Sequence, residues 1–368
     1  KWHLGNHTPD YFPHERGFEH FYGYLCGGIG YWDHNHGGGH DWQRNGETLR
    51  EEGYATRLLA DEAVRLLRTR DRSRPTFLYL AFGAPHLPNE APEPTVAAFG
   101  EIEEESRRVH AAMVSELDTA IGRVIATLEQ EGMADDTLLL FSSDNGGLTA
   151  DGAPPQFVTA ANLALRFFDR PIPIPALEFM VANVLDAGSS NAPLRKGKTS
   201  VAEGGVRVPA ALWWPGQLES ARHEGFTTVS DVLPTLLDAI GRPDLTPSGL
   251  HGASRWAALK GRDSGTTPDY AVAGFEGRAI FRPPWKLVVA GTPRLYDVYA
   301  DPLEQHDRAA EQPELVASLA AALDAWPTLE RPEATTPFGL LWDPDSFGGP
   351  EDREPWADAA KRRGRAAD

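Results

Sequence analysis

The sequence predicts an α/β fold with a mostly parallel central sheet and helices on both faces. A small C-terminal antiparallel sheet with one helix is expected to follow it. Two observations predict this. Segments of helical periodicity alternate with short apolar runs between residues 56 and 143, which is the element order of parallel sheets. After about residue 265 the chain changes to short strand-like runs separated by turns.

Two segments have the periodicity of amphipathic helices. Residues 56–70 place apolar side chains on one face with arginines opposite, and residues 102–131 repeat apolar side chains at helical spacing. Gly132 is a plausible helix stop. The apolar positions are Leu59, Ala63, Leu66 and Leu67 in the first segment and Met113, Leu117, Ile121, Val124 and Leu128 in the second.

Two apolar runs are predicted to be buried strands. Each leads into a loop whose side chains could take part in catalysis or binding. "TFLYLAFG" (76–83) leads into Ala-Pro-His, and "TLLLFSS" (137–143) leads into Asp-Asn-Gly-Gly. Functional groups gather beyond the carboxyl ends of strands in such sheets. The sequence therefore predicts that both loops belong to a site.

The second half is predicted to hold a strand and turn at 206–216 and a capped helix at 230–241. Short strands then precede a helix near 313–325. We expect a catalytic domain at 1–265, a small α+β subdomain at 266–326 and a tail at 327–368. The proline-rich stretch 148–190 is expected to shape a substrate pocket, with a distal packing insertion as the alternative.

Composition excludes some partners. The formal charge of −18 repels nucleic acid and anionic lipid, so neither is expected as a partner, and an anionic substrate would need locally gathered positive charge. No run approaches the ~20 apolar residues of a membrane helix. Cys26 is the single cysteine, so an intrachain disulfide is impossible.

Asp144 and Asn145 are candidate ligands of a hard cation. They are adjacent oxygen donors at a predicted strand end, and the two glycines that follow allow a close turn around an ion. Calcium or magnesium would suit such ligands. A plain turn is the alternative, because Asp-Asn-Gly-Gly is favourable turn sequence anywhere.

Two histidine- or lysine-bearing segments offer groups for anion binding or proton transfer. His86 lies between two nearby prolines in a stiff loop. Lys1 and His3 would face one ligand if their segment is extended. A loop histidine without a role and a frayed chain end are the alternatives.

Basic and histidine-rich stretches leave further alternatives open. The glycine-rich segment at 194–209 suits a tetrahedral anion or is a solvated basic loop. The histidine-rich segment at 31–42 matches no common zinc spacing and is interpreted as an aromatic loop at a site mouth. The residues concerned are Arg195, Lys196, Lys198 and Arg207, and His34, His36 and His40.

Taken in chain order, these motifs resemble the type I sulfatases of the alkaline phosphatase superfamily, the arylsulfatase B-like branch most of all. "KWHLG" is similar to the family's Gly-Lys-Trp-His-Leu-Gly motif without its first glycine. "FLYLAFGAPHLP", "LLLFSSDNGG", "LRKGKTSVAEGGVRVP" and "WKLVVAGTPRLYDVYADPLEQ" follow in family order. The resemblance covers most of residues 1–325.

The resemblance implies a sulfuric ester hydrolase. In this family a cysteine becomes formylglycine, whose hydrated aldehyde attacks sulfur while a calcium ion polarises the sulfate oxygens. Asp144 and Asn145 would be calcium ligands. Lys1 and His3 would steady the formylglycine and the sulfate, and His86 and Lys198 would contact the sulfate and help the leaving oxygen depart.

One departure from the family pattern is large. In the family, two features lie upstream of the Gly-Lys-Trp-His-Leu-Gly motif. They are the modified cysteine, in a Cys-x-Pro-Ser-Arg type motif, and an aspartate pair that completes the calcium site. Cys26 does not replace that cysteine, because Gly27, Gly28 and Ile29 follow it. We therefore expect a fragment of a sulfatase, which alone folds poorly or with a cleft where the missing segment belongs.

The sequence leaves three function classes. The first is an arylsulfatase-type enzyme acting on a small-molecule or saccharide sulfate ester. The second is a phosphodiesterase or phosphonate hydrolase of the same superfamily, and the third is a non-catalytic sulfatase remnant. The family suggests an exported or lysosomal protein, and the sequence assigns no compartment.

Overall fold

A computed structural model describes residues 1–327 and 358, apart from residues 7, 37–38, 150–187, 224 and 263–266. The described residues form two compact units. The first unit holds Lys1–Ala134 with residues 188–189, and the second holds residues 135–149 and 190–327. Each unit is described by itself. Within the described ranges, no helix is long and apolar enough to cross a membrane.

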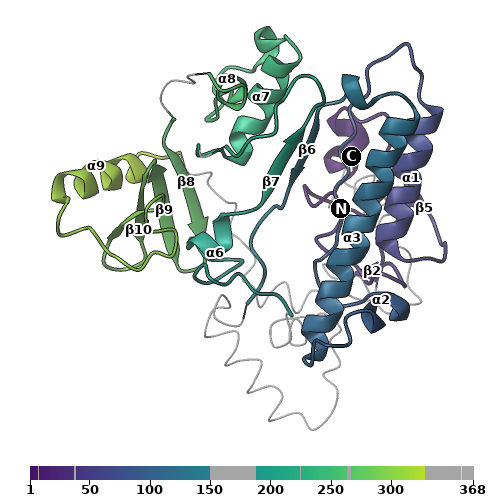
Figure 1. Ribbon diagram of the computed structural model, residues 1–368, viewed down its shortest axis with the longest axis horizontal. Coiled ribbons are helices and arrows are strands. Elements are labelled where there is room, and N and C mark those ends of the chain that lie inside the picture. Colours follow the sequence, from purple (N-terminus) through teal and green to yellow (C-terminus); the bar gives the residue numbers. More distant parts are fainter. Residues whose placement is uncertain are drawn as a thin grey trace. The chain divides into compact units, whose positions relative to one another are not determined.

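Two long helices support the first unit. Helix α1 (Ala55–Thr69) packs along α3 (Glu105–Gln130), and the short α2 (Glu93–Ala97) packs on α3 (Figure 1). Both predicted helices are thus confirmed. Gly132 follows α3 with φ of +67°, a conformation that favours glycine, so it ends the helix as expected. The apolar stripes are buried, with Leu59, Ala63 and Leu67 on α1 and Met113, Val124 and Leu128 on α3.

Short strands and an aromatic core fill the rest of this unit. Strands β1 (Tyr22–Gly23), β4 (Gln43–Arg44) and β5 (Glu47–Thr48) form one antiparallel sheet, and β2 (Asn35–His36) pairs with β3 (Gly39–His40). Two 3₁₀ turns, η1 (Pro9–Tyr11) and η2 (Pro13–Arg16), precede them. The core beside α1 and α3 gathers Tyr24, Ile29, Tyr31, Trp42, Tyr54 and Met113.

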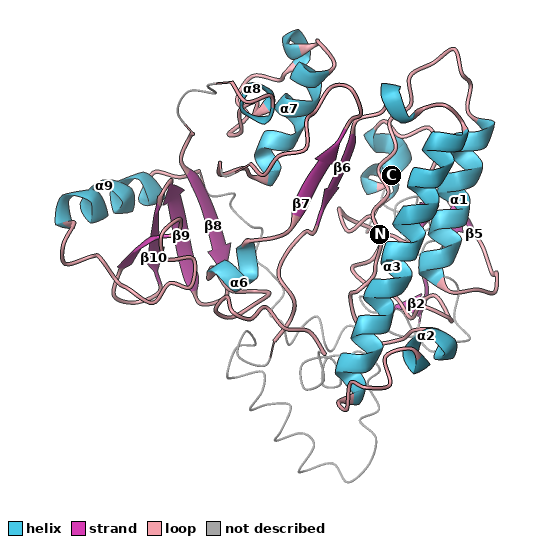
Figure 2. Cartoon of the chain, viewed as in Figure 1, coloured by secondary structure: helices cyan, strands magenta, loops and turns pink. Residues whose placement is uncertain are grey.

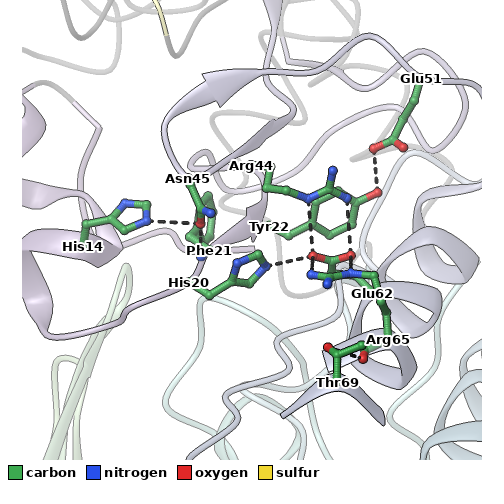
Figure 3. A network of polar contacts seen from close by, with 10 residues as sticks. All are labelled: His14, His20, Phe21, Tyr22, Arg44, Asn45, Glu51, Glu62, Arg65 and Thr69. Carbon is green, nitrogen blue, oxygen red and sulfur yellow. Dashed lines mark hydrogen bonds and ion pairs between the residues drawn. The ribbon is translucent and has the colours of Figure 1, made fainter. Parts of the chain in front are cut away.

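The carboxylate of Glu62 joins α1 to the first sheet (Figure 3). It accepts two hydrogen bonds from Arg65, at 2.7 and 2.8 Å, and two from Arg44 on β4, both at 3.3 Å. His20 Nε2 lies 2.8 Å from the same carboxylate. Burial alone would raise the pKa of Glu62, but the two guanidinium groups outweigh it and lower the pKa to about 2.

The prediction of a strand at 76–83 is wrong. The structure assigns no strand there, and Phe77 and Tyr79 are 72% and 57% exposed. A strand requires a hydrogen-bonded neighbour, which an apolar run does not supply by itself. Leu80 and Phe82 still pack partly against the aromatic core, so the run positions the Ala-Pro-His loop without joining a sheet.

In the second unit, β6 (Leu139–Ser142) confirms the strand predicted at 137–143. Its predicted burial is wrong, because Leu140 and Phe141 are 39% and 37% exposed. Strand β6 pairs with β7 (Ala210–Trp213), which confirms the strand predicted within 206–216. The pairing is antiparallel, with Leu139 opposite Trp213. All strand pairs among the described residues are antiparallel, so the predicted parallel order is not seen in them. An apolar run determines neither the burial of a strand nor the direction of its neighbour.

The predicted C-terminal subdomain structure is confirmed. Strands β8 (Tyr270–Gly274), β9 (Gly277–Arg282), β10 (Trp285–Val289) and β11 (Arg294–Asp297) form an antiparallel sheet in the order β11-β10-β9-β8 (Figure 2). Helix α9 (Pro313–Asp324) lies on this sheet. Leu319 and Leu323 of the helix join Ile280, Leu287 and Leu295 in its core.

Short helices complete the second unit. The helix predicted at 230–241 is confirmed as η4 (Val229–Asp231) and α7 (Val232–Ala239), with Gly241 beyond it at φ of +75°. The remaining elements are η3 (Ala134–Asp136), which spans the boundary of the units, α6 (Glu203–Val206), η5 (Pro243–Leu245) and α8 (Trp256–Leu259).

Two predicted regions lie mostly outside the described residues. They are the substrate-pocket insertion at 148–190 and the tail at 327–368. The predicted domain limits at 265 and 326 stay predictions.

Candidate functional site

The six candidate residues divide between the two units. Lys1, His3 and His86 belong to the first unit, and Asp144, Asn145 and Lys198 belong to the second. Each set is therefore described within its own unit.

The opening segment is held along residues 24–25. Trp2 N donates to Tyr24 O at 2.9 Å, and His3 N donates to Leu25 O at 3.0 Å. The Trp2 ring is buried, and its Nε1 donates to Tyr11 O at 2.7 Å. These bonds argue against a frayed end. The simple extended geometry expected for Lys1 and His3 is wrong, because His3 has φ of +54°.

Two consecutive glycines leave room for the imidazole rings of His3 and His86. A Cβ added at Gly27 would lie 2.7 Å from His3 Nε2, and one added at Gly28 would lie 2.9 Å from His86 Nδ1. Each imidazole ring therefore occupies the space that a side chain at one of these two glycines would fill. Sequence reasoning missed this role of Gly27 and Gly28. The signal was the absence of side chains in two successive residues of a loop rich in large aromatics.

His86 is fixed by its own backbone neighbourhood. Its N donates to Gly83 O at 2.8 Å, and its carbonyl oxygen accepts from Tyr31 Oη at 2.7 Å. His86 Nδ1 lies 2.8 Å from Leu87 O. Because a carbonyl oxygen can only accept, this contact favours a proton on Nδ1. Nε2 is then the nitrogen that gains and loses a proton, and in the protonated ring it suits an acid or a donor to an anion.

The histidine-rich segment does not form the loop at a site mouth that was predicted. His34 is buried and stacks on Trp42, with ring centroids 4.5 Å apart, and its Nε2 lies 3.1 Å from Gly53 O. His40 Nε2 lies 2.6 Å from Leu49 O. Both rings are core residues. Across the described part of the chain, no three His, Cys, Asp or Glu side chains gather as a metal cluster.

His36 is the histidine of this segment that touches the glycine pair. Its Nδ1 lies 2.5 Å from Gly28 O. His36 therefore helps to fix the backbone of Gly28, against which the His86 ring packs.

Cys26 is a packing residue of the first unit. It is a buried free thiol whose Sγ lies 3.2 Å from Asn6 Nδ2. Burial raises the pKa of the thiol well above its usual value, and the carboxylate of Asp41 adds to that effect. The buried Asp41 accepts the backbone N–H groups of Leu25 and Cys26, at 3.1 and 2.8 Å, and so fixes the start of the glycine loop.

In the second unit, the Asp-Asn-Gly-Gly turn interlocks with the lysine-bearing loop 195–205. Gly146 N donates to Gly205 O at 3.0 Å, and Lys198 N donates to Gly147 O at 2.9 Å. A Cβ at Gly146 would lie 1.7 Å from Gly204 O, so no other residue fits. These contacts place Lys198 next to the turn that carries Asp144 and Asn145.

Asn191 joins the same two loops, and its role was not predicted from the sequence. Its Oδ1 accepts from Gly147 N, and its Nδ2 donates to Gly147 O, both at 2.8 Å. The same Nδ2 donates to Lys196 O at 3.0 Å. One amide side chain therefore joins both loops.

Lys198 is a partly buried cation beside a carboxylate. Burial lowers the pKa of its ammonium group, and the nearby Asp144 carboxylate opposes that shift. The other basic side chains of the loop have carboxylate partners. Arg207 pairs with Glu203 at 2.7 Å, Arg195 lies 3.5 Å from Glu304, and Lys196 pairs with Glu276. The anion-binding interpretation of this loop therefore narrows to Lys198.

Asp144 and Asn145 fit a calcium ion as part of its ligand set. Carboxylate and amide oxygens are hard donors, and Ca²⁺ takes about six to eight of them. Two residues supply only a minority of that number. The glycines at 146 and 147 keep the turn compact, so both side chains leave the same short segment.

A family model described as Sulfatase matches residues 1–242, and the chain therefore belongs to the sulfatase family. All six candidate residues fall inside the matched range. The chain is 31% identical to mouse (Mus musculus) arylsulfatase J over 216 residues, which cover 56% of this chain and 30% of that protein. It is 29% identical to human (Homo sapiens) N-acetylgalactosamine-6-sulfatase over 261 residues, which cover 67% of this chain and 42% of that protein.

The fold is similar to solved sulfatases. A crystal structure of Ps i-CgsB in complex with k-i-k-neocarrahexaose matches with a TM-score of 0.73 at 25% identity, covering 95% of this chain and 72% of that one. The predicted family and α/β fold class are thereby confirmed. The chain spans less than half the length of the two curated relatives, arylsulfatase J and N-acetylgalactosamine-6-sulfatase.

Proposed function

We propose that this protein serves the hydrolysis of sulfate monoesters. The observation that carries the proposal is the Sulfatase match over residues 1–242, within which all six candidate residues lie. The local geometry supports it. In the first unit, the rings of His3 and His86 lie against two consecutive glycines, and in the second unit, Lys198 lies beside the turn that carries Asp144 and Asn145.

The residues present suit distinct tasks in this reaction. His86, with Nδ1 directed at Leu87 O, would donate a proton from Nε2 to the leaving oxygen. Lys198 and Lys1 would offset the negative charge of the sulfate group, and His3 would donate a hydrogen bond to it. Sulfate esters need both a proton for the leaving group and positive charge near the sulfonyl oxygens.

Calcium and formylglycine belong to the proposal as the groups that complete the site. Asp144 and Asn145 would hold the calcium ion, which supplies Lewis-acid polarisation of the sulfate oxygens. Residues 1–368 contain one cysteine, and Cys26 is buried, has a raised pKa and lacks the family motif. The formylglycine nucleophile is therefore not proposed at any residue of this sequence.

A sulfated saccharide is the proposed substrate class. One relative is named N-acetylgalactosamine-6-sulfatase, and the similar crystal structure holds k-i-k-neocarrahexaose. Both names refer to sugars. Because the chain has a net charge of −18, it repels an anionic sugar overall. Local cations such as Lys198 are therefore needed to bind one.

The test is sulfate release from 4-nitrocatechol sulfate and from a panel of sulfated mono- and disaccharides. The protein is expressed from its natural reading frame containing residues 1–368. We expect turnover that His86→Ala lowers by roughly 100-fold or more. His14→Ala is the matched control, because His14 contacts Asn45 at 3.3 Å in another part of the first unit. Equal loss in both variants, or no sulfate release by the natural protein, would contradict the proposal.

A further inference from the structure

The loop that carries Lys198 is anchored by buried charges. Lys286 on β10 is fully buried, and its Nζ lies 2.9 Å from Glu203 Oε1 and 2.9 Å from Glu304 Oε1. Both carboxylates are buried as well. Nζ also lies 4.9 Å from the ring centroid of Phe281. A buried ammonium group is unfavourable unless it is paired, so this cluster requires all three charged groups.

One carboxylate of the cluster reaches both ends of the loop. Glu304 Oε2 accepts from the backbone N of Glu203 at 3.1 Å and lies 3.5 Å from Arg195 Nε. The loop closes on itself there, because Gly204 N donates to Arg195 O at 2.9 Å. Lys286 thus holds a carboxylate that clamps the start and the end of the segment containing Lys198.

The turn between β8 and β9 fixes the middle of the loop. Phe275 N donates to Thr199 O at 3.0 Å. A Cβ at Gly274 would lie 2.5 Å from the same oxygen, so the two backbones are in close contact. Thr199 has φ of +78°, an unusual conformation that its neighbours must maintain.

We propose that Lys286 is a positioning residue for Lys198, acting through Glu203 and Glu304. The C-terminal sheet, which carries Lys286, then determines where the backbone of Lys198 lies relative to Asp144. The effect on catalysis rests on the proposed function. The effect on the loop does not.

The test uses Lys286→Met in the protein expressed from its natural reading frame. We expect a roughly 100-fold lower kcat for sulfate release, with KM changed much less, because a small misplacement of a catalytic group has an effect of this size. In hydrogen exchange, we expect the amides of Lys198, Gly204 and Phe275 to exchange at least ~10-fold faster. Unchanged exchange at these three amides would overturn the proposal.

Arg255→Met is the matched control. Arg255 and Asp231 form another buried ion pair of this unit, with Nε 3.1 Å from Oδ2. We expect this variant to lower the melting temperature while kcat and exchange in the Lys198 loop stay at wild-type values. If both variants loosen the loop equally, Lys286 acts on general stability and the proposal is wrong.

Glu304→Gln is the second variant, in case Lys286→Met does not fold. It keeps the shape of the side chain and leaves Lys286 paired with Glu203. The same three amides are expected to exchange faster, and unchanged exchange would again contradict the proposal. A wild-type protein without sulfate release would overturn the proposed function alone, because the exchange measurement does not depend on turnover.

Discussion

Gly27 and Gly28 determine where two imidazole rings of the first unit lie. The atoms that a Cβ would meet are side-chain atoms of His3 and His86. A flexible side chain can move aside at little energetic cost, whereas a backbone cannot. Substitution at these positions should therefore displace the histidines and leave the fold intact.

Gly27→Ala is expected to lower turnover by roughly 10- to 100-fold, because a displaced His3 no longer meets the substrate in its productive geometry. The free energy of unfolding, measured by urea denaturation, should change by less than about 1 kcal/mol. Gly122→Ala on α3 is the control, since nothing lies within 4 Å of its added Cβ. Wild-type turnover in Gly27→Ala would show that His3 has no role in the reaction.

The roles of the candidate residues stay predictions, and their surroundings could not be predicted from the sequence. The order of the motifs identified Lys198 and Asp144, and the structure shows them beside each other. The partners of Arg195 and Arg207 could not be predicted, because Glu304 and Glu203 meet them only through long-range folding. Likewise, the extended shape expected for residues 1–3 fails at the φ of His3.

Among the elements, the two interlocked loops of the second unit depend on Gly146. Its added Cβ would meet the backbone oxygen of Gly204 at 1.7 Å, and that oxygen cannot swing away as a side chain can. Gly146→Ala should therefore separate the loops and lower the free energy of unfolding by about 1–3 kcal/mol. Urea denaturation measures this. A free energy of unfolding equal to that of the wild type would contradict the interlocked arrangement.

The link between α1 and β4 should depend on pH through Glu62 (Figure 3). Its pKa is about 2 in the folded protein, below the usual 4.5, so its stabilisation is fully present above about pH 4.5 and is lost as the pH falls towards 2. Since both arginines are partly exposed, we expect Glu62→Gln to lower the free energy of unfolding by about 1–2 kcal/mol at pH 7.

Urea denaturation of both proteins between pH 3 and pH 7 measures this dependence. The difference between wild type and Glu62→Gln should shrink as the pH falls. A difference that stays constant over this range would contradict the assigned role of the carboxylate.

Helices were more predictable than strands in this chain. The periodic apolar positions of α1 and α3 identify a buried face without reference to any neighbour. The run at 76–83 has strand composition, yet whether it pairs depends on what lies beside it. For the same reason the direction of the β6–β7 pair could not be read from its apolar residues.

At the scale of the whole molecule, the central claim is the class of ester that the protein hydrolyses. The Sulfatase match and the similar crystal structure define the family and the fold. The superfamily alternative, hydrolysis of phosphodiesters or phosphonates, would use similar cations and oxygen ligands. Only the product of the reaction separates these possibilities.

The most direct measurement is therefore of the anion released by the protein from its natural reading frame, with and without calcium. Matched 4-nitrophenyl esters of sulfate, phenylphosphonate and phenyl phosphate serve as substrates. The account predicts inorganic sulfate as the main product, with release that EDTA abolishes, calcium restores and Lys198→Ala lowers by roughly 100-fold. Preferential hydrolysis of either phosphorus ester, or no hydrolysis of any of the three, would contradict it.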